Sequence, residues 1–112
     1  MEGTRLQKVE RLVQKEVGEI VRRRTPELFP GLMVTITRAR VSPDLALAKL
    51  YTSVFPSQHA QAAVDTLTRN VKTLRMDLGR QLRHQLRIIP EMAFFIDDSL
   101  DYIDRIDQLL QK

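Results

Sequence analysis

The chain has 112 residues, no cysteine and a formal net charge of +4 at pH 7, with a pI near 9.9. This length suits one domain with its own core. The lack of cysteine excludes disulfides, thiol nucleophiles and thiolate metal sites. No apolar run resembles a membrane span or a signal peptide. We therefore expect a single soluble domain over residues 1–112, cytoplasmic and monomeric, whose basic charge suits anionic partners.

The first predicted element is a helix over 4–24. Thr4 and Gln7 have the spacing of a capping box, and Pro26 is expected to end the helix because it disfavours helical geometry at the residue before it. The apolar stripe at helical spacing comprises Leu6, Val9, Val13, Val17, Ile20 and Val21. Two interpretations of the run Arg22–Arg24 stay open: cations that complement the helix dipole, or additional phosphate contacts.

Two strands are predicted next, over 32–41 and 45–55, joined by the turn-forming residues 42–44. In the first strand the apolar residues change from even to odd positions, which predicts a β-bulge near Thr37 or Arg38. Because the two strands are close in sequence, we expect them to pair antiparallel.

A long basic helix is the most prominent pattern in the sequence. Ser57 is predicted to cap a helix through Leu67, and residues 65–89 form an amphipathic helical run in which Asn70 tolerates a kink. The apolar stripe of this run comprises Leu67, Val71, Leu74, Leu78 and Leu82. The opposite side carries Arg69, Lys72, Arg80, Arg83 and Arg87, with Arg75 at the boundary. Asp77 is the only acid between residues 66 and 89.

The last predicted elements are an apolar strand over 92–96, of the kind that lies inside a sheet, and a short C-terminal helix capped by Asp98 or Ser99. Three strands cannot bury both faces of a sheet, so the helices must cover one of them. The order helix, strand, strand, helix, helix, strand therefore predicts an α+β fold of two layers.

The charge is unevenly distributed along the chain. Residues 1–96 carry 16 Lys and Arg and 9 Asp and Glu, a net charge of +7, whereas residues 97–112 carry 2 and 5, a net charge of −3. Solvated helix faces usually mix both signs, because like charges three or four residues apart oppose the helix. A cationic face without interleaved acids indicates a polyanion such as nucleic acid. The predicted phosphate contacts are Lys72, Arg75, Arg80, Arg83 and Arg87, with Arg38 and Arg40 on the first strand as secondary candidates.

Several short motifs carry a family resemblance through their order and spacing. They are Val41-Ser42-Pro43-Asp44-Leu45, Ala48-Lys49-Leu50-Tyr51, Leu74-Arg75, Leu78-Gly79, Leu82-Arg83, Pro90-Glu91, Phe94-Phe95, and Asp97-Asp98-Ser99 through Leu109-Leu110. In this arrangement, which covers nearly the whole length, the chain resembles ribosome-binding factor A, a family of small assembly factors of the bacterial small ribosomal subunit.

The resemblance implies a KH-like fold of the bacterial, type II, arrangement. It also implies binding to 16S rRNA on the immature 30S subunit, a role in late maturation and precursor 16S rRNA processing, growth in the cold, and a maturation GTPase on the same particle. RNA-clamping KH domains hold the nucleotide backbone with a Gly-x-x-Gly loop, which this chain lacks. The family has an Ala-x-Gly kink instead, and the corresponding positions here are Asn70-Val71-Lys72, without a glycine.

We find no catalytic or metal-binding pattern in the sequence and expect a non-catalytic protein without a cofactor. His59 and His84 lack partners at ligand spacing and are interpreted as exposed helix residues. Gly79 is expected to permit tight packing against the sheet. Phe94 and Phe95 are expected in the core rather than as stacking platforms.

Two other functions stay open. Asp97, Asp98, Asp101 and Asp104 could hold Mg²⁺ in a metal-dependent RNA-processing nuclease, although helix capping and solvent exposure are the simpler interpretation. The basic helix could instead dock an acidic protein partner, and competition by free RNA would separate that function from RNA binding.

Overall fold

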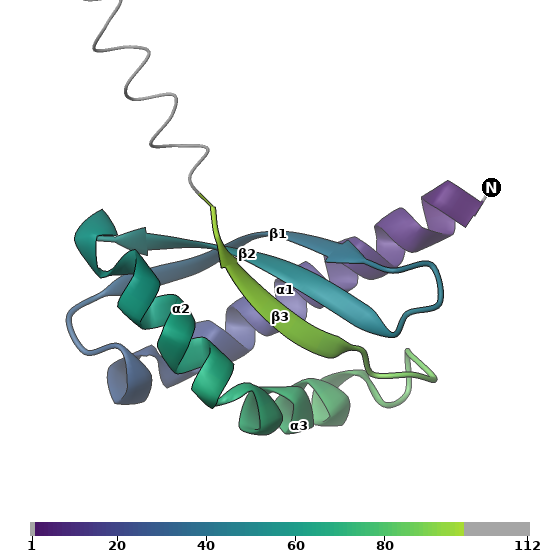
Figure 1. The fold of residues 1–112 in the computed structure, drawn as a ribbon. Coiled ribbons are helices and arrows are strands. Elements are labelled where there is room, and N and C mark those ends of the chain that lie inside the picture. The colour runs from purple at the N-terminus through teal and green to yellow at the C-terminus, as the bar shows by residue number, and fades with distance from the viewer. Residues whose placement is uncertain (1, 98–112) are drawn as a thin grey trace, which may run out of the picture.

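The computed structural model describes residues 2–97, which form one sheet of three strands and three α-helices (Figure 1). In chain order the elements are α1 (Glu2–Leu28), β1 (Met33–Val41), β2 (Leu47–Phe55), the 3₁₀ turn η1 (Ser57–His59), α2 (Ala60–Arg69), α3 (Val71–Leu82) and β3 (Glu91–Ile96). The predicted order of helix, strand, strand, helix, helix, strand is confirmed. The predicted C-terminal helix lies outside the described residues.

The sheet has the order β1-β2-β3, with β1 and β2 antiparallel and β2 and β3 parallel. The antiparallel pair is as predicted, and the parallel pair is possible because α2 and α3 supply the crossover. The prediction that the apolar third strand lies inside the sheet is wrong, since β3 is an edge strand. Its Met92 and Phe94 are buried, whereas Phe95 is 43% exposed and Ile96 37% exposed. Phe95 is therefore not a core residue.

The bulge in β1 keeps its apolar residues on one face. The pairing register with β2 shifts between Ile36 and Arg38, as the sequence predicts. Ile36 before the shift and Ala39 and Val41 after it are all buried. Without the extra residue, the second half of the strand would turn its apolar side chains to solvent.

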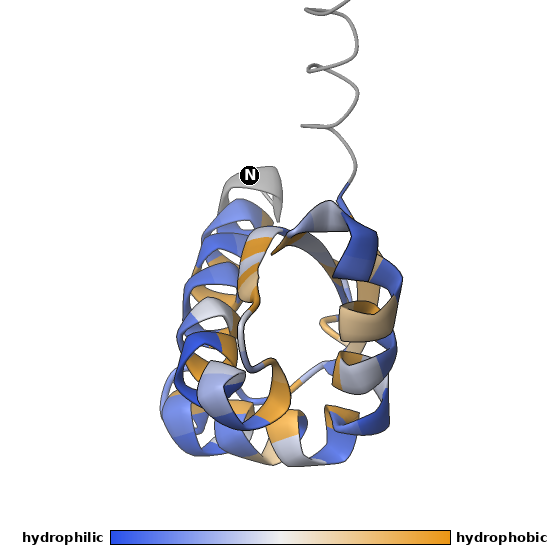
Figure 2. Ribbon diagram, turned by 90° about the vertical axis from the view of Figure 1, so that its left-hand side faces the viewer, coloured by the Kyte–Doolittle hydropathy of each residue, from blue (hydrophilic) through white to orange (hydrophobic). Residues whose placement is uncertain are grey.

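The molecule has two layers, with the helices against one face of the sheet. Along β2 the even-numbered residues Ala48, Leu50 and Val54 are buried, while Leu47 and Phe55 at its ends are exposed on the other face. Figure 1 shows α1 running behind the strands and α2 meeting α3 at an angle. In Figure 2 the apolar residues of α1 turn toward the middle of the molecule and its hydrophilic residues lie outside. Among the described residues, nothing covers the second face of the sheet.

The first helix is longer than predicted, because it continues through Pro26 to Leu28. Phe29 is buried and its N–H donates to Thr25 O at 2.7 Å, so the last turn is held although Pro26 offers no donor. A proline in the last turn costs few helix bonds, and burial of Phe29 offsets that cost. The periodicity of the sequence reveals the apolar stripe of α1, but it does not reveal that Phe29 is buried and holds the last turn.

Two predicted helix caps are wrong. Thr4 lies inside α1, which begins at Glu2, so it does not cap the helix. Ser57 is the first residue of η1, where Pro56 occupies the N-cap position and no side chain caps the turn.

The predicted helical run over 65–89 is two helices followed by an irregular segment. The break is at Asn70, whose φ of −101° and ψ of 13° are not left-handed. Its Nδ2 donates to Thr66 O at 2.8 Å, and its carbonyl accepts from Leu74 N at 3.0 Å. The kink therefore forms without a glycine, through a side-chain hydrogen bond.

α3 ends at Leu82, so the segment from 83 to 89 is not helical. Its apolar Leu86 and Ile89 are half-buried against the core. The apolar spacing that predicted a helix here therefore comes from residues of a non-helical segment that packs on the core. The expected tight packing of Gly79 against the sheet is also wrong, because a Cβ there would meet only Ile89 Cγ1, at 3.8 Å.

The outer edge of β1 is occupied by side chains of α1. Gln14 Nε2 donates to Thr37 O at 3.0 Å, and Glu10 accepts from Val41 N at 2.9 Å. The bulge residue Thr37 also donates from its hydroxyl to the Asp97 carboxylate, which lies across β2. These contacts tie the first helix and the end of β3 to the bulged strand.

The turn between β1 and β2 is longer than predicted, so the second strand begins later in the sequence. The structure begins β2 at Leu47 rather than at the predicted residue 45, because Leu45 takes a left-handed φ of 62° within the turn. Ser42 Oγ donates to Asp44 Oδ1 at 2.7 Å, and Ala46 N donates to the same oxygen at 3.1 Å. Both hydrogen bonds lower the pKa of Asp44 below its ordinary value.

Candidate nucleic-acid interface

Three of the predicted phosphate contacts lie together on the outer side of α3: Lys72 and Arg80 within the helix, and Arg83 at its C-cap, where the backbone keeps a helical conformation. Leu74, Leu78 and Leu82 are fully buried and fix which side of the helix faces the core. At about 100° per residue, Lys72, Arg80 and Arg83 then project within an arc about 80° wide on the solvent side. We call this set the α3 outer face. All three residues are exposed.

Arg75 does not belong to the α3 outer face. Its Nη2 donates to Ile89 O at 2.7 Å and its Nε donates to Pro90 O at 3.2 Å. The guanidinium thus ties the segment between α3 and β3 back onto the helix. These two hydrogen bonds give Arg75 a structural role, whereas its role as a main phosphate contact stays a prediction.

Arg87 lies in the irregular segment after α3 and is exposed. Because the helix ends at Leu82, Arg87 does not continue the row of cations that the sequence predicted. Arg38 and Arg40 lie on β1, where they alternate with the buried Ala39 and Val41. Their side chains therefore point away from the helices, and the seven predicted residues do not form one surface.

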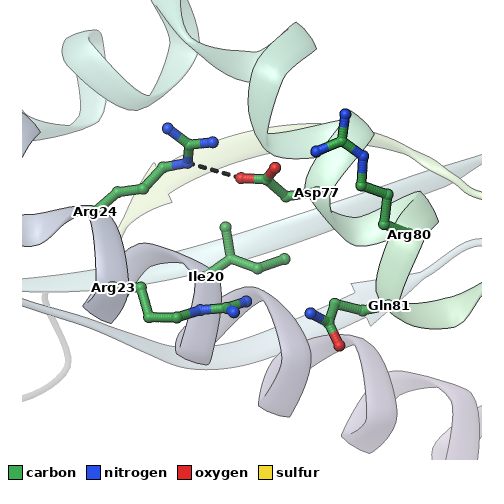
Figure 3. A pocket seen from close by; sticks show the side chains of 6 residues that line it. All are labelled: Ile20, Arg23, Arg24, Asp77, Arg80 and Gln81. Atoms are coloured by element: carbon green, nitrogen blue, oxygen red, sulfur yellow. Dashed lines mark hydrogen bonds and ion pairs between the residues drawn. The ribbon is translucent and has the colours of Figure 1, made fainter.

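A cleft between α1 and α3 brings together arginines that are far apart in sequence. It has a volume of about 290 Å³ and is lined by Ile20, Arg23, Arg24, Asp77, Arg80 and Gln81. In Figure 3, Arg24 from α1 and Arg80 from α3 flank Asp77. The cleft thus carries three guanidinium groups and one carboxylate, and its rim joins Arg23 to the α3 outer face.

Asp77 neutralises one of these arginines. Arg24 Nε donates to Asp77 Oδ2 at 2.7 Å, and this hydrogen bond raises the pKa of Arg24 further above its ordinary value. Their side chains are 28% and 18% exposed, so the pair is partly screened from water. Arg23 and Arg80 are exposed and have no such partner among residues 2–97.

The structure decides one of the two interpretations of the arginine triplet. Since α1 continues to Leu28, its last turn holds no basic residue, and the dipole interpretation is wrong. Arg22 pairs with Glu19, one turn earlier, and Arg24 pairs with Asp77 and Glu27. Arg23 is exposed and forms no ion pair within residues 2–97, so its role as a phosphate contact stays a prediction. The triplet was the only sequence signal for this residue, and its position beside α3 required the fold.

None of the seven predicted phosphate contacts forms an ion pair with a carboxylate within residues 2–97. Arg83 Nε lies 3.2 Å from His84 Nε2, a polar contact between neighbours in the turn after α3. All seven thus keep guanidinium or ammonium donors for another molecule, although Arg75 uses its Nε–H and one Nη2–H within the chain.

The described part of the chain shows no group of three or more His, Cys, Asp or Glu residues that could hold a metal ion. His59 and His84 are exposed as expected, although His59 lies in η1 and His84 in a turn rather than in helices. Of the four aspartates considered for Mg²⁺, three lie outside the described residues, and Asp97 accepts a hydrogen bond from Thr37. No helix in residues 2–97 is long and apolar enough to cross a membrane.

Comparison with known proteins decides the family. A family model described as ribosome-binding factor A matches residues 5–110. The chain belongs to the ribosome-binding factor A family. Ribosome-binding factor A of Cytophaga hutchinsonii is 41% identical over 112 residues, which cover 100% of this chain and 84% of that protein.

Solved structures of ribosome-binding factor A share the fold, which confirms the expected KH-like architecture. The crystal structure from Thermus thermophilus aligns with a TM-score of 0.69 at 22% identity, over 81% of this chain and 94% of that one. A homology model of Thermus thermophilus ribosome binding factor A, fitted into a cryo-EM map of its complex with 30S, aligns with a TM-score of 0.66 at 23% identity, over 81% and 93% of the two chains.

Proposed function

We propose that this protein is a non-catalytic assembly factor that binds 16S rRNA on the immature 30S subunit in the cytoplasm. In this proposal it acts as a monomer, promotes late maturation of the subunit and processing of precursor 16S rRNA, including during growth in the cold, and shares the particle with a maturation GTPase. Family membership supports the proposal, as does the Thermus relative fitted into a 30S complex.

The observation that carries the proposal is the α3 outer face together with Arg23. Lys72 and Arg80 on α3 and Arg83 at its C-cap are exposed on one side and have no carboxylate partner among residues 2–97. Leu74, Leu78 and Leu82 hold the helix against the core, so these cations are presented by a rigid element. A surface of this kind binds phosphates and positions the protein without reading bases.

Binding by this surface is expected to follow subunit shape rather than base sequence. Phosphate contacts carry no direct sequence information, so specificity comes from where the folded rRNA places its backbone. The kink at Asn70 contributes by setting the direction of α3 relative to α2. Glycine-dependent approach of the backbone to a phosphate is not part of the mechanism, because the kink has no glycine.

The α3 outer face can be tested by measuring binding to purified 30S subunits over a range of salt concentrations. Each phosphate contact contributes about −0.7 to −0.9 to the slope of log affinity against log salt. The triple variant Lys72→Gln, Arg80→Gln, Arg83→Gln should therefore bind more weakly and with a slope less steep by about 2 to 3.

A matched control removes the same charge elsewhere. The variant Arg5→Gln, Lys8→Gln, Arg11→Gln changes three exposed cations in the first half of α1, away from the cleft with α3. We expect a smaller change in affinity and slope from this control. Equal effects of the two triple variants would show that only net charge matters and would contradict a specific interface on α3.

The maturation role needs a separate measurement in cells. A strain that lacks its own factor should accumulate precursor 16S rRNA, most strongly at low temperature, and the wild-type chain should reverse this whereas the α3 triple variant should not. Purified protein incubated with precursor RNA and Mg²⁺ should leave the RNA intact. Cleavage that depends on Asp97 or Asp101 would instead support the nuclease alternative.

A further inference from the structure

The face of the sheet opposite the helices carries a second set of basic residues, together with aromatic rings. Side chains alternate along each strand, and on this face the cross-strand pairs are Arg40 with Lys49 and Arg38 with Tyr51. The parallel pairing of β2 and β3 adds Phe95 beside Tyr51. These five residues define what we call the open sheet face.

The two rings of the open sheet face are in contact. The centroids of Tyr51 and Phe95 lie 5.8 Å apart, with an angle of 32° between the ring planes. Phe95 is 43% exposed, whereas its neighbour Phe94 is buried in the core. Leaving a phenylalanine this exposed is unfavourable in a free protein, and a flat apolar partner would remove its surface from water.

The adjacent row of the sheet is basic. Arg40 and Lys49 are direct cross-strand partners, and neither has a carboxylate partner among residues 2–97. Like charges directly opposite each other destabilise a sheet, and an anion between them would relieve the repulsion. A hollow of about 350 Å³ lies at this place, lined by Arg40, Val41, Ser42, Leu47 and Lys49.

Among residues 2–97, the acids near this face are Asp44, which accepts a hydrogen bond from Ser42 in the turn between β1 and β2, and two acids at the ends of β3. Glu91 is exposed at the start of the strand, beside Leu47. Asp97 follows the strand and accepts a hydrogen bond from Thr37. The middle of the face, where Arg38, Arg40 and Lys49 surround the two rings, is therefore positively charged.

We propose that the open sheet face is a platform for single-stranded RNA, on which Tyr51 and Phe95 stack bases while Arg38, Arg40 and Lys49 bind the phosphates. The proposal rests on the proposed function only in taking RNA as the polyanion. Rings beside a row of cations are the combination that binds single strands, because bases stack on the rings as the backbone follows the charge. A duplex keeps its bases stacked inside and cannot use the rings.

The ring contribution can be isolated with two substitutions at Phe95 in the full chain. Phe95→Leu keeps an apolar side chain but removes the ring, and Phe95→Trp keeps a ring. The probes are a fluorescent single-stranded RNA of about ten nucleotides, within the range that one sheet platform of this kind covers, and a duplex RNA of similar length. Thermal unfolding of each variant checks that the sheet is intact.

Phe95→Leu should weaken binding of the single strand by about 5- to 150-fold, the range seen when one stacked base loses its ring. Phe95→Trp should bind the single strand as well as the wild type does. Duplex binding should change little in either variant. Equal binding of the single strand by the Leu and Trp variants would overturn the stacking role.

The basic row is tested with Arg40→Gln and Lys49→Gln. Each should make the salt slope for the single strand less steep by about 0.7. The α3 triple variant should leave the ratio of affinities between wild type and Phe95→Leu unchanged, because α3 lies on the other side of the sheet. If the α3 variant loses 30S binding while Phe95→Leu binds the single strand normally, the platform is refuted and the proposed function stands.

Discussion

Asp77 sets the charge of the cleft between α1 and α3. It is the only acid on α3, and its hydrogen bond with Arg24 joins two residues that are 53 positions apart in sequence, one on each helix. The Asp77 carboxylate has one effect that favours stability and another that disfavours the binding of anions. It stabilises the packing of the two helices, and it reduces the positive charge beside the α3 outer face.

Asp77→Asn should separate these two effects. The variant loses an ion pair whose partners are 28% and 18% exposed, so the free energy of unfolding should fall by about 1 kcal/mol. At the same time Arg24 becomes available to a phosphate, so RNA binding should tighten and its salt slope steepen by about 0.7 to 0.9. Denaturant unfolding and RNA titrations measure the two quantities.

Asp65→Asn is the matched control for Asp77→Asn, because Asp65 is an exposed acid on α2 that is hydrogen-bonded to Gln61 within its own helix. Its effect on both quantities should be smaller. Weaker RNA binding by the Asp77→Asn variant, with its fold intact, would count against the cleft as part of the interface.

Thr52 is the one buried polar side chain in the described core whose hydroxyl has no hydrogen-bond partner. An unsatisfied buried hydroxyl is destabilising, whereas an apolar group of the same shape is not. Thr52→Val should therefore raise the free energy of unfolding by about 1 kcal/mol. Thr52→Ser, which keeps the hydroxyl and loses a methyl group, should lower it, and a stability loss in the Val variant would show that the hydroxyl is satisfied in solution.

At the scale of elements, α3 contains a glycine that its surroundings do not require. A Cβ on Gly79 would meet only Ile89 Cγ1 at 3.8 Å, an ordinary contact, and the backbone there is helical. Glycine in a helix interior is less favourable than alanine. Gly79→Ala should therefore stabilise the protein.

The expected gain for Gly79→Ala is about 0.5 to 1 kcal/mol, measured as a shift of the denaturant midpoint. Binding to 30S subunits should be unchanged, because the α3 outer face keeps its cations. A loss of stability would mean that the segment from 83 to 89 packs more closely on α3 than the structure shows.

The strands were predictable because burial of one face leaves a period of two in the sequence. Even the bulge between Ile36 and Arg38 could be located, since the apolar positions change parity there. The ends of the helices could not be predicted in the same way. α1 continues past Pro26 because Phe29 is anchored in the core, which is a tertiary contact.

The candidate site was only partly predictable for the same reason. Leu86 and Ile89 extend the apolar spacing beyond Leu82 although the chain there is not helical, so the sequence placed Arg87 on a helix that had already ended. Spacing along the chain identified Lys72, Arg80 and Arg83. It could not place Arg23 beside Arg80, because that proximity depends on how α1 packs on α3.

At the scale of the whole molecule, the described cations lie on opposite sides of the sheet. The α3 outer face lies on the helical side, and Arg38, Arg40 and Lys49 lie on the other. The chain carries a net charge of +4, to which residues 1–96 contribute +7 and residues 97–112 contribute −3, and an excess of like charge destabilises a compact fold through self-repulsion. Salt should therefore act in opposite directions on stability and on RNA binding.

Raising sodium chloride from about 0.01 M to about 0.15 M shortens the Debye length from about 30 Å to about 8 Å. We expect the melting temperature of the free protein to rise over this range while its affinity for RNA falls. Scanning calorimetry and RNA titrations in the same buffers measure both. A fall in melting temperature would mean that the ion pairs of Arg22 and Arg24 contribute more to stability than the repulsion costs.

The contacts of Gln14 and Glu10 with the bulged strand have a consequence for how copies of this protein behave toward one another. An unpaired edge strand is the usual place where a second chain adds its own strand and starts aggregation. Here a carbonyl and an amide on the outer edge of β1 are already bonded to α1. A strand from another molecule would first have to displace the α1 side chains from β1. Edge-to-edge association of two copies through β1 is therefore disfavoured even at high protein concentration.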